Sequence, residues 1–279
     1  MPIELPLSVW PTAQRSARAQ RAGRYLDLSG THPAKMLPAI AARVIATYSA
    51  AGDTIVDAMC GMGTTLVEAM YLGRDAIGVE LEPHWAELAR ANLVHARAHG
   101  APGHGEVVTG DARDLPALVD PAVRGLVPLV LFSPPYGPSL HGKVAARPGA
   151  GVEKTHNRYS DDRTNLGNVG LARLLAAMRE VLHATLGVLR PGGFVVMTVR
   201  PWWRDGRMID LPGALVRVGE EAGLTLFERN VALLAGIRGD ELVPHASFFA
   251  LDNVRKARAA GVLRLVVGHE DVLALRRPA

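Results

Sequence analysis

Cysteine and lysine are both scarce in this chain of 279 residues. The single cysteine, Cys60, has no partner for an internal disulfide. With one cysteine, scattered histidines and no CxxC or HExxH pattern, we expect no metal site. No apolar run approaches the ~20 residues that a membrane span needs, and the first residues lack a secretory pattern. We therefore expect a cytoplasmic protein with no membrane partner.

Positive charge comes almost entirely from arginine, because only four residues are lysine. The net charge of +4 is too small to identify a partner. Arginine makes paired contacts with phosphate and guanine, but a GC-rich coding sequence would also favour it. Residues 1–30 are expected to form a basic N-terminal leader, either a helical stripe that follows phosphates or a solvated segment; its arginines at spacing three are Arg15, Arg18, Arg21 and Arg24.

Short apolar strands alternate with helical segments beyond this leader. We expect strands at 54–59, 76–79, 106–109, 127–132, 194–199, 224–234 and 263–275. The expected helices lie at 36–52, 66–72, 83–97, 171–189 and 212–222. This alternation is typical of βαβ units around a parallel sheet. Because no repeat or linker interrupts it, residues 31–279 are expected to form a single domain.

The first predicted strand ends in a glycine-rich turn, the run DAMCGMGTT at residues 57–65. Such a turn lets a ligand approach the backbone, and the helix after it offers free N–H groups. The third glycine of a dinucleotide fingerprint is missing. Glu80 ends the second strand, where it can accept hydrogen bonds from both ribose hydroxyls, and Asp111 ends the third, where it can accept from an adenine amine. The glycine-rich turn, Glu80 and Asp111, in this order along the chain, predict a ligand that contains adenosine.

The fourth predicted strand ends in Ser133-Pro134-Pro135-Tyr136. Consecutive prolines remove two backbone donors and fix φ, so this turn presents rigid carbonyl oxygens. The serine hydroxyl and a carbonyl can accept both protons of an exocyclic amine, while the tyrosine ring stacks on the base. The lone pair of this poor nucleophile is then directed at a methyl group. The motif predicts methylation of a nucleobase amine.

These motifs resemble those of the DNA methyltransferases that methylate base amines. The target motif of that family is Ser, Asn or Asp followed by Pro-Pro-Tyr. Its cofactor motif is Asp-Pro-Phe-x-Gly-x-Gly-Thr, in which Ala58 and Met59 of this chain replace Pro and Phe. Residues 32–36 resemble the segment beside the methionine end of the cofactor. The resemblance covers roughly residues 31–200. The cofactor motifs precede the target motif at Ser133, and this order is similar to the gamma arrangement of the family.

The resemblance implies an α/β, Rossmann-like S-adenosylmethionine-dependent methyltransferase fold. Its mostly parallel sheet has seven strands, and the last strand is antiparallel. S-adenosyl-L-methionine is the implied cofactor, and the residues expected to bind it are His32, Lys35, Asp57, Cys60, Gly61, Gly63, Thr64, Thr65, Glu80, Asp111 and Ala112. The expected catalytic residues are Ser133, Pro134, Pro135 and Tyr136.

The expected activity is methylation of an exocyclic amine in DNA, with cytosine N4 ahead of adenine N6, because Ser-Pro-Pro-Tyr is commonest among cytosine-N4 enzymes. The resemblance also implies that this DNA methylation is part of a restriction-modification system, in which the protein has a restriction or accessory partner. An RNA methyltransferase acting on guanine N2 is the enzymatic alternative. The other alternative is a DNA-binding or cofactor-sensing protein on an inactive scaffold. Cytosine-C5 methylation is excluded, because Cys60 lies in the cofactor turn and not beside a target base.

Two loops are expected to recognise the target. An enzyme acting on duplex DNA must rotate the base out of the stack and contact the strand. Residues 137–168 are too long for an ordinary connection and carry His141, Lys143, Arg147, Lys154, His156, Arg158 and Arg163. The alternative for this loop is a lid that only excludes water. The second loop, residues 235–261, is expected to be irregular with a short helix and carries Arg238, His245, Arg255, Lys256 and Arg258.

Overall fold

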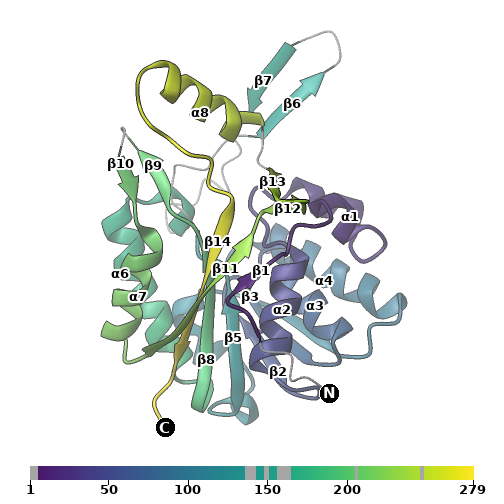
Figure 1. Cartoon of the computed structure of the whole chain (residues 1–279). Coiled ribbons are helices and arrows are strands. Elements are labelled where there is room, and N and C mark those ends of the chain that lie inside the picture. Colours follow the sequence, from purple (N-terminus) through teal and green to yellow (C-terminus); the bar gives the residue numbers. More distant parts are fainter. Residues whose placement is uncertain (1–5, 136–142, 148–150, 156–164, 205–206, 246–247) are drawn as a thin grey trace, which may run out of the picture.

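The computed structural model describes residues 6–135, 143–147, 151–155, 165–204, 207–245 and 248–279. Eight strands form one sheet in the order β1-β11-β14-β8-β5-β2-β3-β4 (Figure 1). β14 runs antiparallel to β11 and β8, whereas all other neighbours are parallel. The strand bounds are β1 Val9–Trp10, β2 Thr54–Asp57, β3 Asp75–Glu80, β4 Gly105–Thr109, β5 Val127–Phe132, β8 Leu189–Val199, β11 Thr225–Leu233 and β14 His269–Arg276. The predicted α/β class with an antiparallel last strand is confirmed.

Helices cover both faces of the sheet (Figure 1). One face packs against α2 (Pro38–Tyr48), α3 (Thr64–Tyr71) and α4 (Pro83–Ala98), and the other against α5 (Leu115–Leu118), α6 (Leu171–Thr185) and α7 (Leu211–Glu221). Successive residues of β5 join the two cores in turn, because strand side chains alternate between faces. Leu129 and Leu131 contact the first core, while Val130 and Phe132 contact the second. This double burial explains the unbroken apolar sequence of β5.

Several sequence predictions differ from the structure at element boundaries. The helix expected at 36–52 ends at Tyr48, and the strand expected at 54–59 ends at Asp57. The helix expected at 171–189 ends at Thr185, and β8 begins at Leu189 in place of the turn expected before residue 194. Gly192 has a φ of 73°, and the pairing of β8 with β5 shifts register near Leu129, so a bulge absorbs the Pro-Gly-Gly run within the strand. The last strand begins at His269 and not at residue 263, because β11 ends at Leu233 and provides no earlier partner.

The segment expected to be a basic leader packs against the domain over residues 6–30. β1 adds an eighth, parallel strand beside β11, and Trp10 and Tyr25 are buried. The helical stripe of four arginines, one of the two alternatives for this segment, does not form, because α1 covers only Ala17–Arg21. Arg21 turns inward to donate to the carbonyl oxygen of Met36, and Arg24 pairs with an acidic side chain of α3.

That acidic side chain is Glu68, which is 3% exposed. It accepts hydrogen bonds from the Tyr25 hydroxyl at 2.6 Å and from Arg24 Nη2 at 2.8 Å. The Arg24 guanidinium also lies 3.9 Å from the centre of the Tyr71 ring. Burial raises the pKa of Glu68, and the contacts with Tyr25 and Arg24 lower it. A buried carboxylate with two donors therefore fixes the N-terminal segment on α3.

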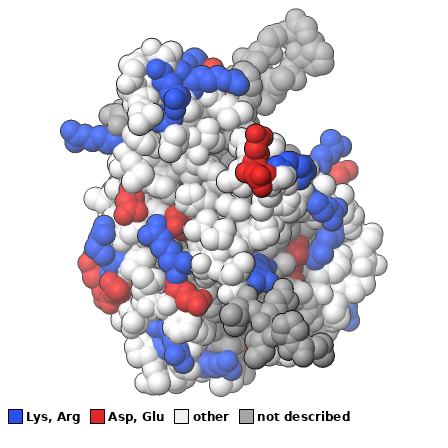
Figure 2. All heavy atoms as spheres, viewed as in Figure 1, with Lys and Arg blue, Asp and Glu red and all other residues white. Residues whose placement is uncertain are grey.

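The two predicted target loops lie at the same end of the molecule (Figure 1). The first contains the hairpin β6 (Lys143–Arg147) and β7 (Gly151–Thr155). The second was expected to hold a short helix, which is α8 (Phe248–Ala259), but it also holds the hairpin β12 (Ala235–Arg238) and β13 (Glu241–Pro244). A further short hairpin, β9 (Trp202–Arg204) and β10 (Arg207–Ile209), follows β8. Figure 2 shows Lys and Arg side chains gathered over α8. No helix among the described residues is long and apolar enough to cross a membrane.

The buried contact of Tyr25 leads to a stability prediction. Tyr25→Phe removes the hydroxyl and leaves one buried oxygen of Glu68 without its donor. We expect the free energy of unfolding, measured by urea denaturation, to fall by about 1–3 kcal/mol. Tyr71→Phe retains the ring beside Arg24 and is the matched control. An equal loss in both variants would contradict the anchoring role of Tyr25.

Candidate active site

The candidate site lies where the strand order reverses. From β2 the chain proceeds through β3 and β4 on one side and then returns to β5 on the other side of β2. In open α/β sheets, ligands bind beyond the carboxyl ends of the strands at this reversal. A cavity opens there with about 940 Å³ of empty space, part of it open to solvent. Residues that follow β2, β3, β4 and β5 all line it.

The turn after β2 depends on two glycines in the left-handed region. Gly61 and Gly63 have φ values of 52° and 85°, which side chains with a Cβ rarely adopt. A Cβ on Gly61 would lie 2.9 Å from Nε2 of His32, and one on Gly63 would lie 3.3 Å from Cβ of Ala89. Gly63 then begins α3, whose first residues Thr64 and Thr65 are buried beside the cavity. The turn is compact because these positions lack side chains.

Asp57 ends β2 and is almost fully buried. Its Oδ1 accepts a hydrogen bond from the backbone N–H of Met59 at 3.0 Å. Burial raises the pKa of Asp57 to about 7, the Thr65 hydroxyl and the Met59 amide oppose that rise, and the charge of Glu80 adds to it. A carboxyl in this state is stabilised in its ionised form by a cationic group.

Glu80 ends β3 and joins two turns. Its Oε2 accepts from the N–H of Gly61 at 2.8 Å, and its Oε1 accepts from the N–H of Glu82 at 2.9 Å. Burial raises the pKa of Glu80, and these amides lower it. Each carboxylate oxygen has a further lone pair, so Glu80 can still accept from two hydroxyls of a ligand.

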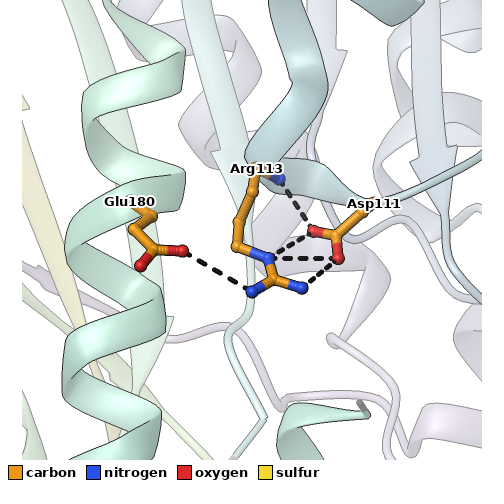
Figure 3. A network of polar contacts seen from close by, with 3 residues as sticks. All are labelled: Asp111, Arg113 and Glu180. Atoms are coloured by element: carbon orange, nitrogen blue, oxygen red, sulfur yellow. Dashed lines mark hydrogen bonds and ion pairs between the residues drawn. The ribbon is translucent and has the colours of Figure 1, made fainter.

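Asp111 follows β4 and is held by Arg113 (Figure 3). Its Oδ2 lies 2.6 Å from Arg113 Nη2, and its Oδ1 accepts from the backbone N–H of the same residue at 2.9 Å. Arg113 Nη1 also lies 3.5 Å from Glu180 Oε2 on α6. The Arg113 side chain is the main cause of the lowered pKa of Asp111. Asp111 is therefore an ionised acceptor at the cavity, next to Ala112, which also lines it.

His32 and Lys35 close the cavity from the N-terminal segment. His32 is buried, with its ring edge-on to Trp85 at 4.5 Å between ring centres. Lys35 Nζ donates to the carbonyl oxygens of His32 at 2.6 Å and Gly30 at 3.1 Å, which fixes this turn. Asn92 of α4 holds the chain just before it, through Ser29 and the N–H of Leu26.

The predicted target motif reaches the same cavity. Ser133 and Pro135 line it, and Pro134 is buried beside them. Tyr136, the expected stacking residue, lies outside the described residues. Cys60 also lines the cavity, and burial raises the pKa of its thiol well above the usual value. Such a thiol is a packed side chain and not an activated nucleophile.

The predicted site did not include Arg113, Glu82 and Asn165. Asn165 lines the cavity and donates from Nδ2 to Glu82 Oε1 at 2.7 Å, while its Oδ1 accepts from the N–H of Gly167 at 2.9 Å. Asn165 is far from the cofactor motifs in sequence, so the local signals that mark those motifs did not point to it. Arg113 could have been found from its place two residues after Asp111, next to a helix start.

The lining fits S-adenosyl-L-methionine by charge and by hydrogen bonding. Three carboxyls, those of Asp57, Glu80 and Asp111, line a cavity that also has apolar walls from Met36, Met59, Leu81 and Leu166. The ligand carries a sulfonium and an ammonium, which the carboxyls complement, and it offers hydroxyl and amine donors for their oxygens. The residues present therefore suit the implied cofactor.

The predicted nucleic-acid residues are described only in part. His141, His156, Arg158 and Arg163 lie outside the described residues. The backbones of Lys143 and Arg147 lie on β6 and that of Lys154 on β7, but their side chains are also outside what the structure describes. In the second loop, α8 carries exposed Arg255, Lys256 and Arg258, and Lys256 pairs with Asp252 at 2.8 Å. Within the described ranges, no group of three or more His, Cys, Asp or Glu is arranged to hold a metal ion.

Comparison with known proteins supports a methyltransferase. Residues 4–91 match the family model described as DNA methylase, which supports the amino-methyltransferase family. This segment includes His32, Asp57 and Glu80 but ends before Asp111 and Ser133, so the target motif and the motif order stay predictions.

A curated relative is the tRNA (guanine(10)-N2)-dimethyltransferase of Methanothermobacter thermautotrophicus, which is 33% identical over 148 residues. The match covers 52% of this chain and 39% of that protein, so the chain spans well under half the length of this relative.

Two solved structures are similar over most of the chain. TrmN from Thermus thermophilus has a TM-score of 0.53 and 18% identity, covering 92% of this chain and 53% of that one. A TehB-like SAM-dependent methyltransferase from Corynebacterium glutamicum has a TM-score of 0.45 and 17% identity, covering 91% and 93%. The first likeness shows the shared fold. The fold and the family match together support methyl transfer with S-adenosyl-L-methionine as the cofactor.

The raised pKa of Asp57 predicts a pH-dependent cost of folding. In the unfolded chain an aspartate ionises near pH 4, whereas in the folded chain Asp57 stays protonated to about pH 7. The folded state thus binds more protons between these values, and stability falls as pH rises through them. Asp57→Asn removes the dependence. We expect the stability of this variant relative to the natural protein to rise by about 2 kcal/mol between pH 5 and pH 7.5.

Urea unfolding of both proteins at the two pH values measures this difference. Asp240→Asn, at an exposed position, is the control, and its difference from the natural protein should stay constant. A constant difference for Asp57→Asn as well would show that burial does not raise the pKa of this carboxyl.

Proposed function

We propose that this protein methylates an exocyclic base amine in DNA, and that the amine is N4 of cytosine. The observation that carries the proposal is the lining of one cavity by Ser133 and Pro135 together with three carboxyls that suit the cofactor. A group that holds an amine and a group that holds a methyl donor are useful together only in methyl transfer to that amine. The DNA methylase match over residues 4–91 favours DNA as the substrate.

In this proposal the residues of the chain bind and orient. Glu80 and Asp111 accept hydrogen bonds from the adenosine part of the cofactor, and Asp57 faces its positive charge. When bound, S-adenosyl-L-methionine supplies a methyl group activated by a sulfonium. Ser133 and a carbonyl of the Pro134-Pro135 turn accept hydrogen bonds from the two N–H groups of the amine. These bonds leave the nitrogen lone pair directed at the methyl carbon. The Tyr136 ring is expected from the sequence to stack on the base.

The basic side chains of the two loops would hold the strand around the flipped base. Arg255, Lys256 and Arg258 are exposed on α8, which lies at the end of the molecule toward which the parallel strands run (Figure 1). His141, Lys143, Arg147, Lys154, Arg158 and Arg163 are proposed to contribute from the first loop. Contacts of this kind position the duplex and add salt dependence to binding.

Guanine N2 in RNA is the second candidate, because a relative with 33% identity over 148 residues is a tRNA (guanine(10)-N2)-dimethyltransferase. The chemistry at Ser133 would be similar, since guanine N2 is also an exocyclic amine whose lone pair is delocalised into the ring.

Incubation with tritiated S-adenosylmethionine and either genomic DNA or total RNA separates these candidates. We expect label in DNA, recovered as N4-methylcytosine after digestion to nucleosides. Label in N6-methyladenine would support DNA as the substrate and adenine N6, in place of cytosine N4, as the methylated amine. Label in N2-methylguanosine of RNA would support the second candidate, and no transfer to either substrate would favour a binding protein on an inactive scaffold.

The role of Glu80 can be tested without a nucleic acid. Glu80→Gln cannot accept from both Gly61 and Glu82, because one side-chain oxygen becomes an N–H donor. We expect calorimetric titration to show an affinity for S-adenosylmethionine lower by about 10- to 100-fold. Glu106→Gln, exposed on the neighbouring β4, should bind as the natural protein does. An unchanged affinity in Glu80→Gln would refute its assignment to the cofactor.

Ser133→Ala should separate turnover from cofactor binding. The hydroxyl orients the amine in the transition state, so we expect kcat to fall by about 100-fold while the dissociation constant for S-adenosylmethionine changes little. Ser8→Ala, at an exposed position, is the control. A kcat within a few-fold of the natural value would exclude Ser133 from the target site.

A further inference from the structure

A second cleft opens beside the cofactor cavity and holds about 1330 Å³ of empty space, part of it open to solvent. Ser133 lines both spaces, and so does the turn formed by residues 34–36. Other walls of the second cleft come from the N-terminal segment and from Arg200 and Leu234, which directly follow β8 and β11. A substrate whose amine is held at Ser133 can therefore extend from the cofactor cavity into this cleft.

Cationic side chains outnumber carboxyls in the described lining of the second cleft. The cations are Arg15, Arg21, Lys35 and Arg200, and the acidic residue among the described lining residues is Glu270. Burial raises the pKa of Glu270 and the charge of Arg200 lowers it, so these two groups compensate each other in part. The charge of Glu68 acts on Arg21 in a similar way. The remaining balance is positive, and a lining of this sign suits an anionic ligand.

Arg15 is the cation of this lining that is best placed to meet such a ligand. It is exposed, and its Nη2 donates to the carbonyl oxygen of Ala19 at 2.8 Å. The carbonyl carries no net charge, so this contact leaves the positive charge of the guanidinium in place. It also uses only one of the five N–H donors of the side chain. Arg15 can therefore still offer a pair of donors to a ligand in the cleft.

Gln20 fixes the backbone of Arg15 relative to the domain core. Its Nε2 donates to the carbonyl oxygens of Thr12 and Arg15, both at 2.9 Å. Its Oε1 accepts from the N–H of Ala39 at 2.9 Å, in the first turn of α2. One side chain thus ties the turn before α1 to a core helix. The position of Arg15 is set before a ligand binds, which lowers the entropic cost of the contact.

We propose that the second cleft binds the phosphodiester of the acceptor nucleotide in DNA, and that Arg15 is the side chain that binds it. This inference rests on the proposed function. A base whose amine reaches Ser133 is rotated out of the duplex, and its own sugar and phosphate move with it. A guanidinium can donate two parallel hydrogen bonds to phosphate oxygens. Such a contact carries no sequence information, so Arg15 positions the acceptor nucleotide and does not select its base.

Arg15→Gln and Arg18→Gln form a matched pair of variants. Both arginines are exposed and lie three positions apart, but Arg18 does not line the second cleft. With a DNA oligonucleotide that the natural protein methylates, we expect kcat/KM to fall about 10-fold in Arg15→Gln and to stay within twofold of the natural value in Arg18→Gln. Because both positions are exposed, the thermal midpoint should not change in either variant.

The affinity for S-adenosylmethionine should also be unchanged in both variants. This measurement separates the phosphate from the carboxylate of the cofactor, which is the other anion that could reach this cleft, since residues 34–36 line both spaces. Weaker binding of S-adenosylmethionine by Arg15→Gln would assign the cation to the cofactor and overturn the proposal.

A neutral methylphosphonate in place of either phosphate that flanks the acceptor nucleotide identifies the group that Arg15 binds. At one of these positions the natural protein should lose about 10-fold in kcat/KM, and Arg15→Gln should lose nothing further, because the contact is already absent. Losses that add at both positions would contradict the proposal, as would equal effects of Arg15→Gln and Arg18→Gln. A natural protein that methylates no DNA would instead refute the proposed function and this inference with it.

Discussion

The contact between Glu80 and the N–H of Gly61 is the interaction on which the rest of the site depends. It fastens the turn after β2 to the end of β3, and its second oxygen fastens the start of the segment that leads into α4. Glycine is required on the other side of this contact, because Gly61 has a positive φ and His32 occupies the space of a Cβ. One carboxylate therefore sets both the shape of the cofactor turn and the place of the acceptors around it.

The sequence predicted this half of the site because its signals are local. Each strand of the parallel sheet ends in a residue whose chemistry stands out from the apolar run before it, as with Asp57, Glu80, Asp111 and Ser133. Periodicity gives the strands, and the parallel arrangement brings their ends together, so neighbours at the edge can be foreseen without knowing distances. The elements from 54 to 132 accordingly match the predicted ranges closely.

What could not be predicted depends on contacts between residues far apart in the chain. Asn165 reaches Glu82 across 83 positions, and Tyr25 reaches Glu68 across 43. β1 was missed because its two residues are strand only by virtue of pairing with β11. The start of β14 was misplaced for a similar reason, since residues 263–268 look like a strand but lack a partner there.

The antiparallel direction of β14 also bears on how such a protein can diversify. Leu233 and His269 are register partners, so the residues between them leave and re-enter the sheet at adjacent points. Lengthening a connection whose ends are already together costs only the entropy of a longer loop, about 0.6 kcal/mol for each doubling. The segment that holds the hairpin β12–β13 and α8 can therefore be exchanged for another of different length or sequence. The sheet stays closed at Leu233 and His269, and none of the residues between them lines the cofactor cavity. One continuous stretch of coding sequence therefore carries the whole insertion between β11 and β14.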